Sequence, residues 1–428
     1  MNNQSIPSDE RATSTDYTRP YRPRLVSCIN RAAGFAGLKG STLTSESLIE
    51  DAKRKTGLDD FGPGDFIHRL DLLLDSVNAE AGLNFTGRFM ARQNYIRILI
   101  NRLRIQRDLN RDPSKSAIPM QDPVFVVGLQ RTGTTAMQRL ISADAAKFRH
   151  LASWEAISPA PLKKGAGPDR AKDPRIQKTA LARKALQYLA PDFFAIHPVQ
   201  ELDPEEDCLL FDYDFWSTVP EATMRVPSFS RWLEAQDHTG AYRYYRTMLA
   251  YLYSQYPVGR WVLKTPQHME HLHELFTVFP DSTVIQTHRD PVKVIASFCS
   301  MISHAYGIFS DTVDPVEIGS HWSAKAVLMV ERSMTIREKI SAGRFIDVAY
   351  RDIVDRPIDT IKKIYSSLGM DFTEANTQLI EDWVLNNPQH KFGKHRYRAE
   401  DFGLDVPALR KRFAPYIRKY NIPEERDA

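Results

Sequence analysis

The chain contains few cysteines and little net charge. Its three cysteines, Cys28, Cys208 and Cys299, are far apart. An odd number of widely separated cysteines does not suit a disulfide framework and indicates a reducing compartment. Lys and Arg number 57 against 53 Asp and Glu, which leaves a net charge of only +4. So small an excess disfavours a general polyanion binder, and we expect no nucleic-acid partner.

Long apolar stretches are also absent. No run approaches the roughly 18 apolar residues of a membrane span, so we expect no transmembrane segment. The first residues, MNNQSIPSDERATSTDYTRPYRPR, are polar and lack the apolar core of a signal peptide. We therefore expect a cytoplasmic protein, and peripheral membrane contact is compatible with this interpretation.

The pattern along the chain predicts three parts. Residues 1–40 are rich in Ser, Thr, Pro and Arg, and their irregular apolar spacing predicts a weakly ordered segment. Apolar residues at helical spacing over 46–55, 64–80 and 87–109 predict a small helical unit across 41–112. A Pro-rich linker then leads into a larger α/β domain, which we place at 120–420.

Short apolar strands alternate with helices in the larger domain. We expect strands at 124–127, 261–264, 283–288 and 345–348, with helices over 133–142, 267–278, from 291 onward and over 357–368. This order predicts an α/β fold with a P-loop-like parallel sheet flanked by helices on both faces. Ligands of such sheets bind at the carboxyl ends of the strands, where Gly128, Lys264, Arg289 and Tyr350 stand.

The first of these strands leads into a loop of phosphate-binding type. Residues 128–135 read GLQRTGTT and stand between a strand and a helix, where backbone amides and the helix N-terminus form an anion cradle. A nucleoside triphosphate loop needs a Lys before its final Ser or Thr, and Thr134 stands there instead. Phosphoryl transfer is thus disfavoured, whereas a shorter anionic chain fits. The alternative is an ordinary turn without a ligand.

The loop resembles the phosphosulfate loop of sulfotransferases that use 3′-phosphoadenosine 5′-phosphosulfate (PAPS). That loop is commonly P-[KR]-[ST]-G-T-T, and here Gln130 replaces its Pro. Together with the N-terminal helical unit, the resemblance points to a bacterial-type branch. It implies PAPS as donor, adenosine 3′,5′-bisphosphate (PAP) as product and no metal. It also implies that the 5′-phosphosulfate is held by Arg131, Thr132, Gly133, Thr134 and Thr135.

The second signature of that family is a strand ending in Arg, with Ser eight residues later. Here these residues are Arg289 and Ser297, and Asp290–Pro291 between them suits a helix start. Arg provides a planar fork of donors that matches phosphate, and the resemblance implies that this pair binds the nucleotide 3′-phosphate. The alternative is that Arg289 pairs with Asp290 and Ser297 is an ordinary helix residue.

Weaker resemblances involve three further segments. Tyr350, in Tyr-Arg-Asp, matches a Tyr-Glu-Asp segment whose Tyr lies by the adenine. Residues 391–397 resemble a late loop that closes over the 3′-phosphate, which implies roles for Lys391, Gly393 and Lys394. Lys264 stands in a segment that resembles the family's strand-end L-K-[ST]-P.

Sulfuryl transfer needs a group to stabilise the leaving phosphate and a base to take the acceptor's proton. Lys264 is the candidate for the first role, and a solvated strand-end lysine is the alternative. Glu155 is favoured as base because related branches place a Glu similarly, and His268 is the rival. The alternatives without a catalytic role are that Glu155 is an ordinary carboxylate at a helix start and that His268 is a solvated histidine on a helix. The remaining candidates for the base are His197, Glu205 and Glu206.

A metal is not expected in the segment that contains His268, His271 and His273. The spacing is not HExxH, and no cysteine or second carboxylate cluster is placed to complete a site.

The sequence thus predicts a PAPS-dependent sulfotransferase that acts on a hydroxyl or amine of a small-molecule acceptor. A P-loop kinase or NTPase is the alternative mechanism, and a catalytically silent nucleotide-binding protein is the alternative class. No motif names the acceptor or the oligomeric state, and a homodimer is compatible with the sequence.

Overall fold

The computed structural model describes residues 14–38, 40, 42–162, 167, 169–388 and 397–425. Within these residues five parallel strands form one sheet in the order β2-β3-β1-β4-β5. The strands are β1 (Val124–Val127), β2 (Phe148–His150), β3 (Arg260–Lys264), β4 (Thr283–His288) and β5 (Phe345–Ala349). The predicted parallel sheet is confirmed. The edge strand β2 was not expected, because three residues of mixed polarity give no apolar run.

The central strand β1 is buried on both faces of the sheet. Val124 and Val126 pack into one apolar core, and Phe125 and Val127 pack into the other. All four side chains are fully buried. This explains the unbroken apolar sequence of β1, because a parallel strand covered by helices on both sides has no solvent-facing residues.

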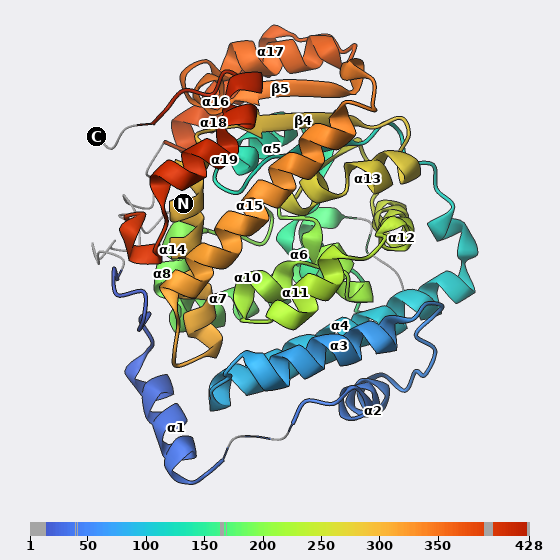
Figure 1. Ribbon diagram of the computed structural model, residues 1–428. Helices are drawn as coiled ribbons and strands as arrows, with labels where there is room; N and C mark the ends of the chain where they lie inside the picture. The colour runs from blue at the N-terminus through green and yellow to red at the C-terminus, as the bar shows by residue number, and fades with distance from the viewer. Residues whose placement is uncertain are drawn as a thin grey trace, which may run out of the picture.

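Helices cover the two faces, as Figure 1 shows for α17 and the long diagonal α15. The helices after β1 are α5 (Thr134–Ser142), α6 (Ser153–Ile157), α7 (Pro174–Leu189), α8 (Pro191–Ile196), α9 (Cys208–Phe211), α10 (Val219–Thr223), α11 (Pro227–Glu234), α12 (Thr239–Gln255), α13 (Leu272–Val278), α14 (Pro291–Phe309), α15 (Pro315–Arg337), α16 (Tyr350–Asp355), α17 (Pro357–Ser367), α18 (Glu374–Asn386) and α19 (Val406–Lys419). The short 3₁₀ helices are η1 (Pro113–Ser116), η2 (Arg170–Lys172), η3 (Asp212–Asp214), η4 (Pro266–Glu270), η5 (Ala342–Arg344) and η6 (Glu400–Phe402).

The single helix expected over 267–278 is divided into η4 and α13. Pro266 occupies the first turn, and the Thr265 hydroxyl caps it by accepting from the Gln267 amide. The His271 amide closes this turn on the carbonyl oxygen of His268, a 3₁₀ bond of 3.1 Å. His271 then has an extended φ of −127°, so α13 begins anew after it.

The N-terminal helices are α1 (Arg24–Phe35), α2 (Ser45–Thr56), α3 (Phe66–Glu80) and α4 (Phe85–Arg111). In Figure 1 they lie below the sheet, where α3 and α4 run beneath α10 and α11 and α1 stands apart at the lower left. Two buried arginines join them to the rest of the chain, because Arg69 and Arg102 both pair with Asp214, at 2.7 and 2.9 Å. The helical unit and the α/β part therefore share one core.

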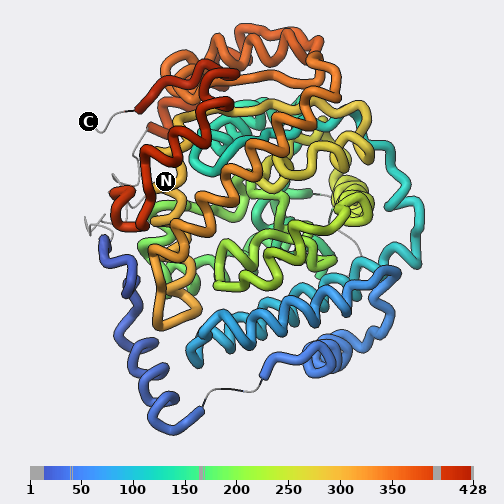
Figure 2. Tube along the Cα trace, viewed as in Figure 1, coloured from blue at the N-terminus to red at the C-terminus, as the bar shows by residue number. Residues whose placement is uncertain are grey.

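The segment 1–40 was expected to be weakly ordered, yet its described part contains α1 and contacts the far end of the chain. The Tyr17 ring lies 4.8 Å from that of Phe402, and Figure 2 shows the blue N-terminal trace rising to the red C-terminal helices. The order comes from these tertiary contacts, which local composition does not reveal.

Among the described helices, α14 alone is long and apolar enough to cross a membrane. However, 72% of its apolar stretch is buried inside the fold, where it packs beside α15. A core helix has this same composition.

Candidate active site

The loop after β1 has a shape that requires its two glycines. A Cβ on Gly128 would lie 2.4 Å from the Thr287 hydroxyl. Gly133 has φ of 91°, and a Cβ there would lie 2.9 Å from the Tyr350 ring. The Thr132 hydroxyl donates to the Leu129 carbonyl at 2.6 Å and bonds the Thr287 hydroxyl at 2.7 Å. The loop is thereby fixed against β4, and its last residues begin α5.

Arg131 projects from this loop toward α14. It has a left-handed φ of 69°, and its Nε donates to the Ser297 hydroxyl at 3.3 Å. Its described hydrogen-bond acceptors, Ser297 and the Ile196 carbonyl, are both neutral. A largely buried guanidinium beside the free amides of a helix N-terminus is a strong site for an anion.

Arg289 lies on the other side of the same loop. Its Nη1 donates to the Arg131 carbonyl at 3.0 Å, and its guanidinium lies 4.0 Å from the centre of the Tyr350 ring. The alternative pairing with Asp290 does not occur. Asp290 instead caps α14 through the Val292 amide and pairs with Arg410 at 3.0 Å. The structure therefore brings Arg131, Ser297, Arg289 and Tyr350 together around Gly133.

The donor fork of Arg289 is engaged by a carboxylate from the C-terminal end of the chain. Both oxygens of Glu425 accept from Arg289, each at 2.8 Å, and both side chains are mostly buried. The Glu425 amide in turn donates to Asp290 at 2.9 Å. No sequence motif pointed to Glu425, because it follows α19 in an ordinary acidic tail.

A cavity of about 240 Å³ opens beside the loop. Arg131, Thr134 and Thr135 line it, together with His197 and Glu206. An adjoining hollow of about 110 Å³ shares Arg131, Thr135 and His197, and Lys264 lines it as well. The two hollows therefore connect the phosphate loop to the end of β3.

Lys264 and Glu206 form a close ion pair in this region. Lys264 is 1% exposed, and its Nζ lies 2.6 Å from Glu206 Oε1. Burial alone would raise the pKa of Glu206, but Lys264 and His197 lower it below its ordinary value. Burial lowers the pKa of His197, against the raising effect of Glu205 and Glu206. Glu206 is thus an ionised carboxylate at the cavity wall.

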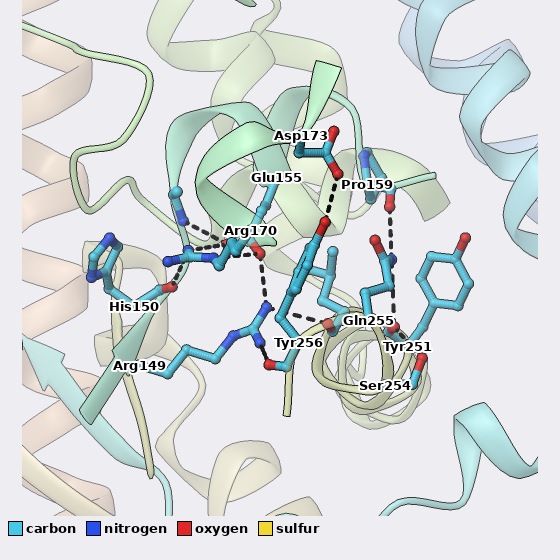
Figure 3. A network of polar contacts seen from close by, with 12 residues as sticks. Arg149, His150, Glu155, Pro159, Arg170, Asp173, Tyr251, Ser254, Gln255 and Tyr256 are labelled. Atoms are coloured by element: carbon cyan, nitrogen blue, oxygen red, sulfur yellow. Dashed lines mark hydrogen bonds and ion pairs between the residues drawn. The ribbon is translucent and has the colours of Figure 1, made fainter. Parts of the chain in front are cut away.

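Glu155 lies elsewhere, in a buried polar network (Figure 3). Its carboxylate pairs with Arg149 at 2.8 Å and with Arg170 at 2.7 Å, and it also accepts from the Ala152 amide. It is 1% exposed and does not line the cavity. Burial would raise its pKa, but the two arginines outweigh burial and lower it. This environment argues against Glu155 as the base, because both its oxygens are committed to buried partners and it lines neither hollow.

His268 is also enclosed in the core. Its Nδ1 bonds the Tyr242 hydroxyl at 2.7 Å, and its Nε2 lies 3.3 Å from Asp207. The ring is fully buried and lines neither hollow. With both ring nitrogens engaged, His268 serves to position Asp207 and α12, and the geometry does not favour it as a base.

The remaining predicted residues are placed as follows. Glu205 lines both hollows, but both its carboxylate oxygens already have partners. They accept hydrogen bonds from the Ser153 hydroxyl and from the Glu206 amide, each at 2.9 Å. Lys391, Gly393 and Lys394 lie outside the described residues. Across the described part of the chain, no three His, Cys, Asp or Glu side chains are grouped to hold a metal ion.

Comparisons with known proteins identify the family. The sequence model of the Sulfotransferase family matches residues 123–374, more than half of the chain. The structure resembles two solved sulfotransferases. STF9 of Mycobacterium avium has a TM-score of 0.82 at 28% identity, over 91% of this chain and 99% of that one. STF1 of Mycobacterium tuberculosis H37Rv has a TM-score of 0.77 at 31% identity, over 87% and 99%.

A curated relative matches a shorter region. The omega-hydroxy-beta-dihydromenaquinone-9 sulfotransferase Stf3 of Mycobacterium bovis is 22% identical over 145 residues, which are 32% of this chain and 36% of Stf3. The match therefore spans about a third of either protein. The match to the family's sequence model and the two similar solved structures show that the chain belongs to the sulfotransferase family, in agreement with its loop and its sheet order.

Proposed function

We propose that the protein transfers the sulfuryl group of PAPS to a hydroxyl or amine of a small-molecule acceptor. The observation that carries this proposal is the gathering of Arg131, Ser297, Arg289 and Tyr350 around Gly133, on a loop without the Walker lysine. Two separated cationic groups suit a nucleotide with phosphate at both its 3′ and 5′ positions.

The donor is held at three points in this proposal. The 5′-phosphosulfate lies on the amides of the first turn of α5, with Thr134, Thr135 and Arg131 beside it. The adenine lies by Tyr350. The 3′-phosphate takes the fork of Arg289 in place of Glu425 and accepts from the Ser297 hydroxyl.

Glu206 and Lys264 carry the chemistry. The acceptor oxygen or nitrogen attacks sulfur, and its proton passes to Glu206. The bond from sulfur to the bridging phosphate oxygen breaks, and the electron pair stays on PAP. Lys264 donates a hydrogen bond to that oxygen and so stabilises the charge that develops there. Their ion pair keeps Glu206 ionised before the acceptor binds.

The cavity supports an acceptor with an apolar body. Its walls include Phe193, Leu209, Phe298, Met301, Trp322 and Met329. The curated relative Stf3 is named for an omega-hydroxylated menaquinone, which is an alcohol on a large apolar frame. Free, widely separated cysteines, two of them buried, support a cytoplasmic location.

Nucleotide binding and transfer test the proposal together. Calorimetry with PAP and ADP should show tighter binding of PAP, and incubation with PAPS and a panel of alcohols should yield sulfate esters by mass spectrometry. Lys264→Ala should slow transfer by about a hundredfold or more while PAP still binds. Equal affinity for ADP and PAP would contradict the donor assignment, and PAP binding without any transfer would favour a silent nucleotide-binding protein.

A further inference from the structure

Three more charged side chains reach the acceptor cavity, from elements other than the phosphate loop. Glu221 on α10, Glu270 at the end of η4 and Lys325 on α15 all line it. They are 2%, 4% and 5% exposed. The sequence gives no hint of the cluster, because its members are separated by about fifty residues each and carry no motif.

Lys325 faces three carboxylates, those of Glu221, Glu234 and Glu270. Its Nζ hydrogen-bonds Glu234 at 2.7 Å and lies farther from Glu270 and Glu221, at 3.3 and 3.4 Å. Both Glu221 oxygens and Glu270 Oε2 lack a hydrogen bond of normal geometry within the described part of the chain. Their other cations, His321 and Arg332, are 3.5 and 3.6 Å away.

Buried carboxylate oxygens that have cations nearby but no hydrogen bond of normal geometry are costly to keep. Such atoms persist where a ligand or water supplies the missing donor. A purely structural ion cluster would close its hydrogen bonds internally, as Glu234 does with Lys325. Glu221 and Glu270 instead present oxygens at the wall of a cavity.

Carboxyl groups outnumber cations in the lining of the cavity, although burial raises the pKa of one of them, Glu270. Four carboxylates, of Glu205, Glu206, Glu221 and Glu270, face the cavity against the cations of Arg131 and Lys325. In the proposed function, the anionic sulfuryl donor binds Arg131, so this cation does not balance the carboxylates that face the acceptor. Burial opposes ionisation of Glu221, but Lys325 and His321 lower its pKa to about 2, so it is an anion at neutral pH.

We infer that Glu221 and Glu270 form a specificity subsite for a second group on the acceptor, a hydrogen-bond donor that is best when cationic. The acceptor then carries an ammonium or hydroxyl apart from the hydroxyl that receives the sulfuryl group, on an apolar frame packed against Phe298, Met301 and Trp322. Acceptors with a carboxylate at that position are rejected. The inference rests on the proposed function, because it assigns the acceptor to this cavity.

Four terminal alcohols of equal length test the subsite: aminohexanol, hexanediol, hexanol and hydroxyhexanoate. Their affinities are measured by saturation-transfer NMR titration with PAP present at saturation and at neutral pH. We expect aminohexanol to bind about tenfold tighter than hexanol, because a hydrogen bond to a charged group gains more than a neutral one. Hydroxyhexanoate should bind most weakly.

Three variants localise the effect. Glu270→Gln and Glu221→Gln should each reduce the preference for aminohexanol over hexanol to about threefold or less. Glu201→Gln is the matched control, because Glu201 is a part-buried carboxylate that pairs with Arg183 and lines neither hollow, and it should keep the wild-type preference. Thermal melts check that each variant is folded, and the order of affinities in the wild-type protein decides the question even if Glu221→Gln does not fold.

The inference is overturned by any of three outcomes. These are hydroxyhexanoate binding as tightly as aminohexanol, an unchanged preference in Glu270→Gln, and no measurable binding of any probe. Calorimetric PAP affinity in the same samples reports separately on the proposed function, so failure of the subsite and failure of the donor assignment are distinguishable.

Discussion

The donor side and the acceptor side of the site are built in different ways. The donor side is compact in sequence: a strand, six residues of loop and a helix start provide most of it, and Arg289 after β4 with Ser297 on α14 completes it. The acceptor side draws on α10, η4, α14 and α15 together with the segment before α9. In the proposed function, anion binding uses backbone amides that any such loop provides, whereas the acceptor meets side chains that the fold alone brings together.

Two buried carboxylates, Glu155 and Glu206, differ in their partners and in whether they reach the cavity. Glu155 is held between Arg149 and Arg170, away from the cavity, and its charge stabilises the packing of α6. Glu206 forms one ion pair, with Lys264, and accepts a weak hydrogen bond from the Cys208 thiol at the cavity wall. Both have a lowered pKa because of nearby cations, yet only Glu206 can be reached by an acceptor. Burial and charge alone therefore do not distinguish a base from a structural ion pair.

The largest expected effect is that of Glu206→Gln on turnover. Loss of the base should lower kcat by about a thousandfold, with PAP affinity unchanged. In the wild-type protein the base form exists above the lowered pKa, so kcat/KM should stay level from neutral pH down to the ordinary glutamate value of 4.5 and fall only below it. Steady-state assays over this range measure both. Near-normal kcat in Glu206→Gln would show that Glu206 is not the base, and Glu206 would then not differ in role from Glu155.

The second test is Glu155→Gln, which should affect stability instead. Leaving Arg149 buried without its partner should lower the free energy of unfolding by about 3 to 5 kcal/mol. Because the folded pKa of Glu155 is lowered, its stabilisation is fully present above pH 4.5 and is lost as the pH falls through the folded pKa. Urea unfolding of both proteins should therefore show a difference that narrows in acid. Loss of turnover in a variant with normal stability would restore Glu155 as the base.

A third variant, Arg289→Ala, probes the donor side. Loss of a charged fork to the 3′-phosphate should weaken PAP by about thirtyfold, and ADP, which has no 3′-phosphate, should bind as before. Calorimetry with the two nucleotides measures this. Arg410→Ala is the neighbouring control, because Arg410 pairs with Asp290 and does not touch the loop. Equal weakening of both nucleotides would mean that Arg289 only holds the loop in place.

The smallest expected effect concerns the C-terminal carboxylate. Glu425→Gln removes the group that competes with phosphate for Arg289, so PAP should bind about fivefold more tightly. Glu424→Gln, which alters the adjacent carboxylate paired with Arg410, should leave PAP affinity unchanged. Weaker PAP binding in Glu425→Gln would show that Glu425 orients Arg289 and does not compete with the ligand.

The parallel sheet and the phosphate loop could be predicted because their signals are local. β1 is a continuous apolar run and β3, β4 and β5 each contain a short apolar segment, and Gly128 and Gly133 stand where loop geometry requires glycine. The strand β2 was missed because an edge strand of three mixed residues has no periodicity. The division of 267–278 was missed because it depends on the non-helical backbone of a single residue, His271.

The sequence by itself determined the family, the order of strands and helices and the position of the anion loop, since each depends on residues close together along the chain. Only the tertiary structure decided which carboxylate faces the cavity. Glu155 and Glu206 are equally polar in sequence, and their difference arises from arginines and a lysine that other elements bring to them. The subsite of Glu221, Glu270 and Lys325 is likewise a product of folding, because charges distant in sequence interact strongly only once they are buried side by side.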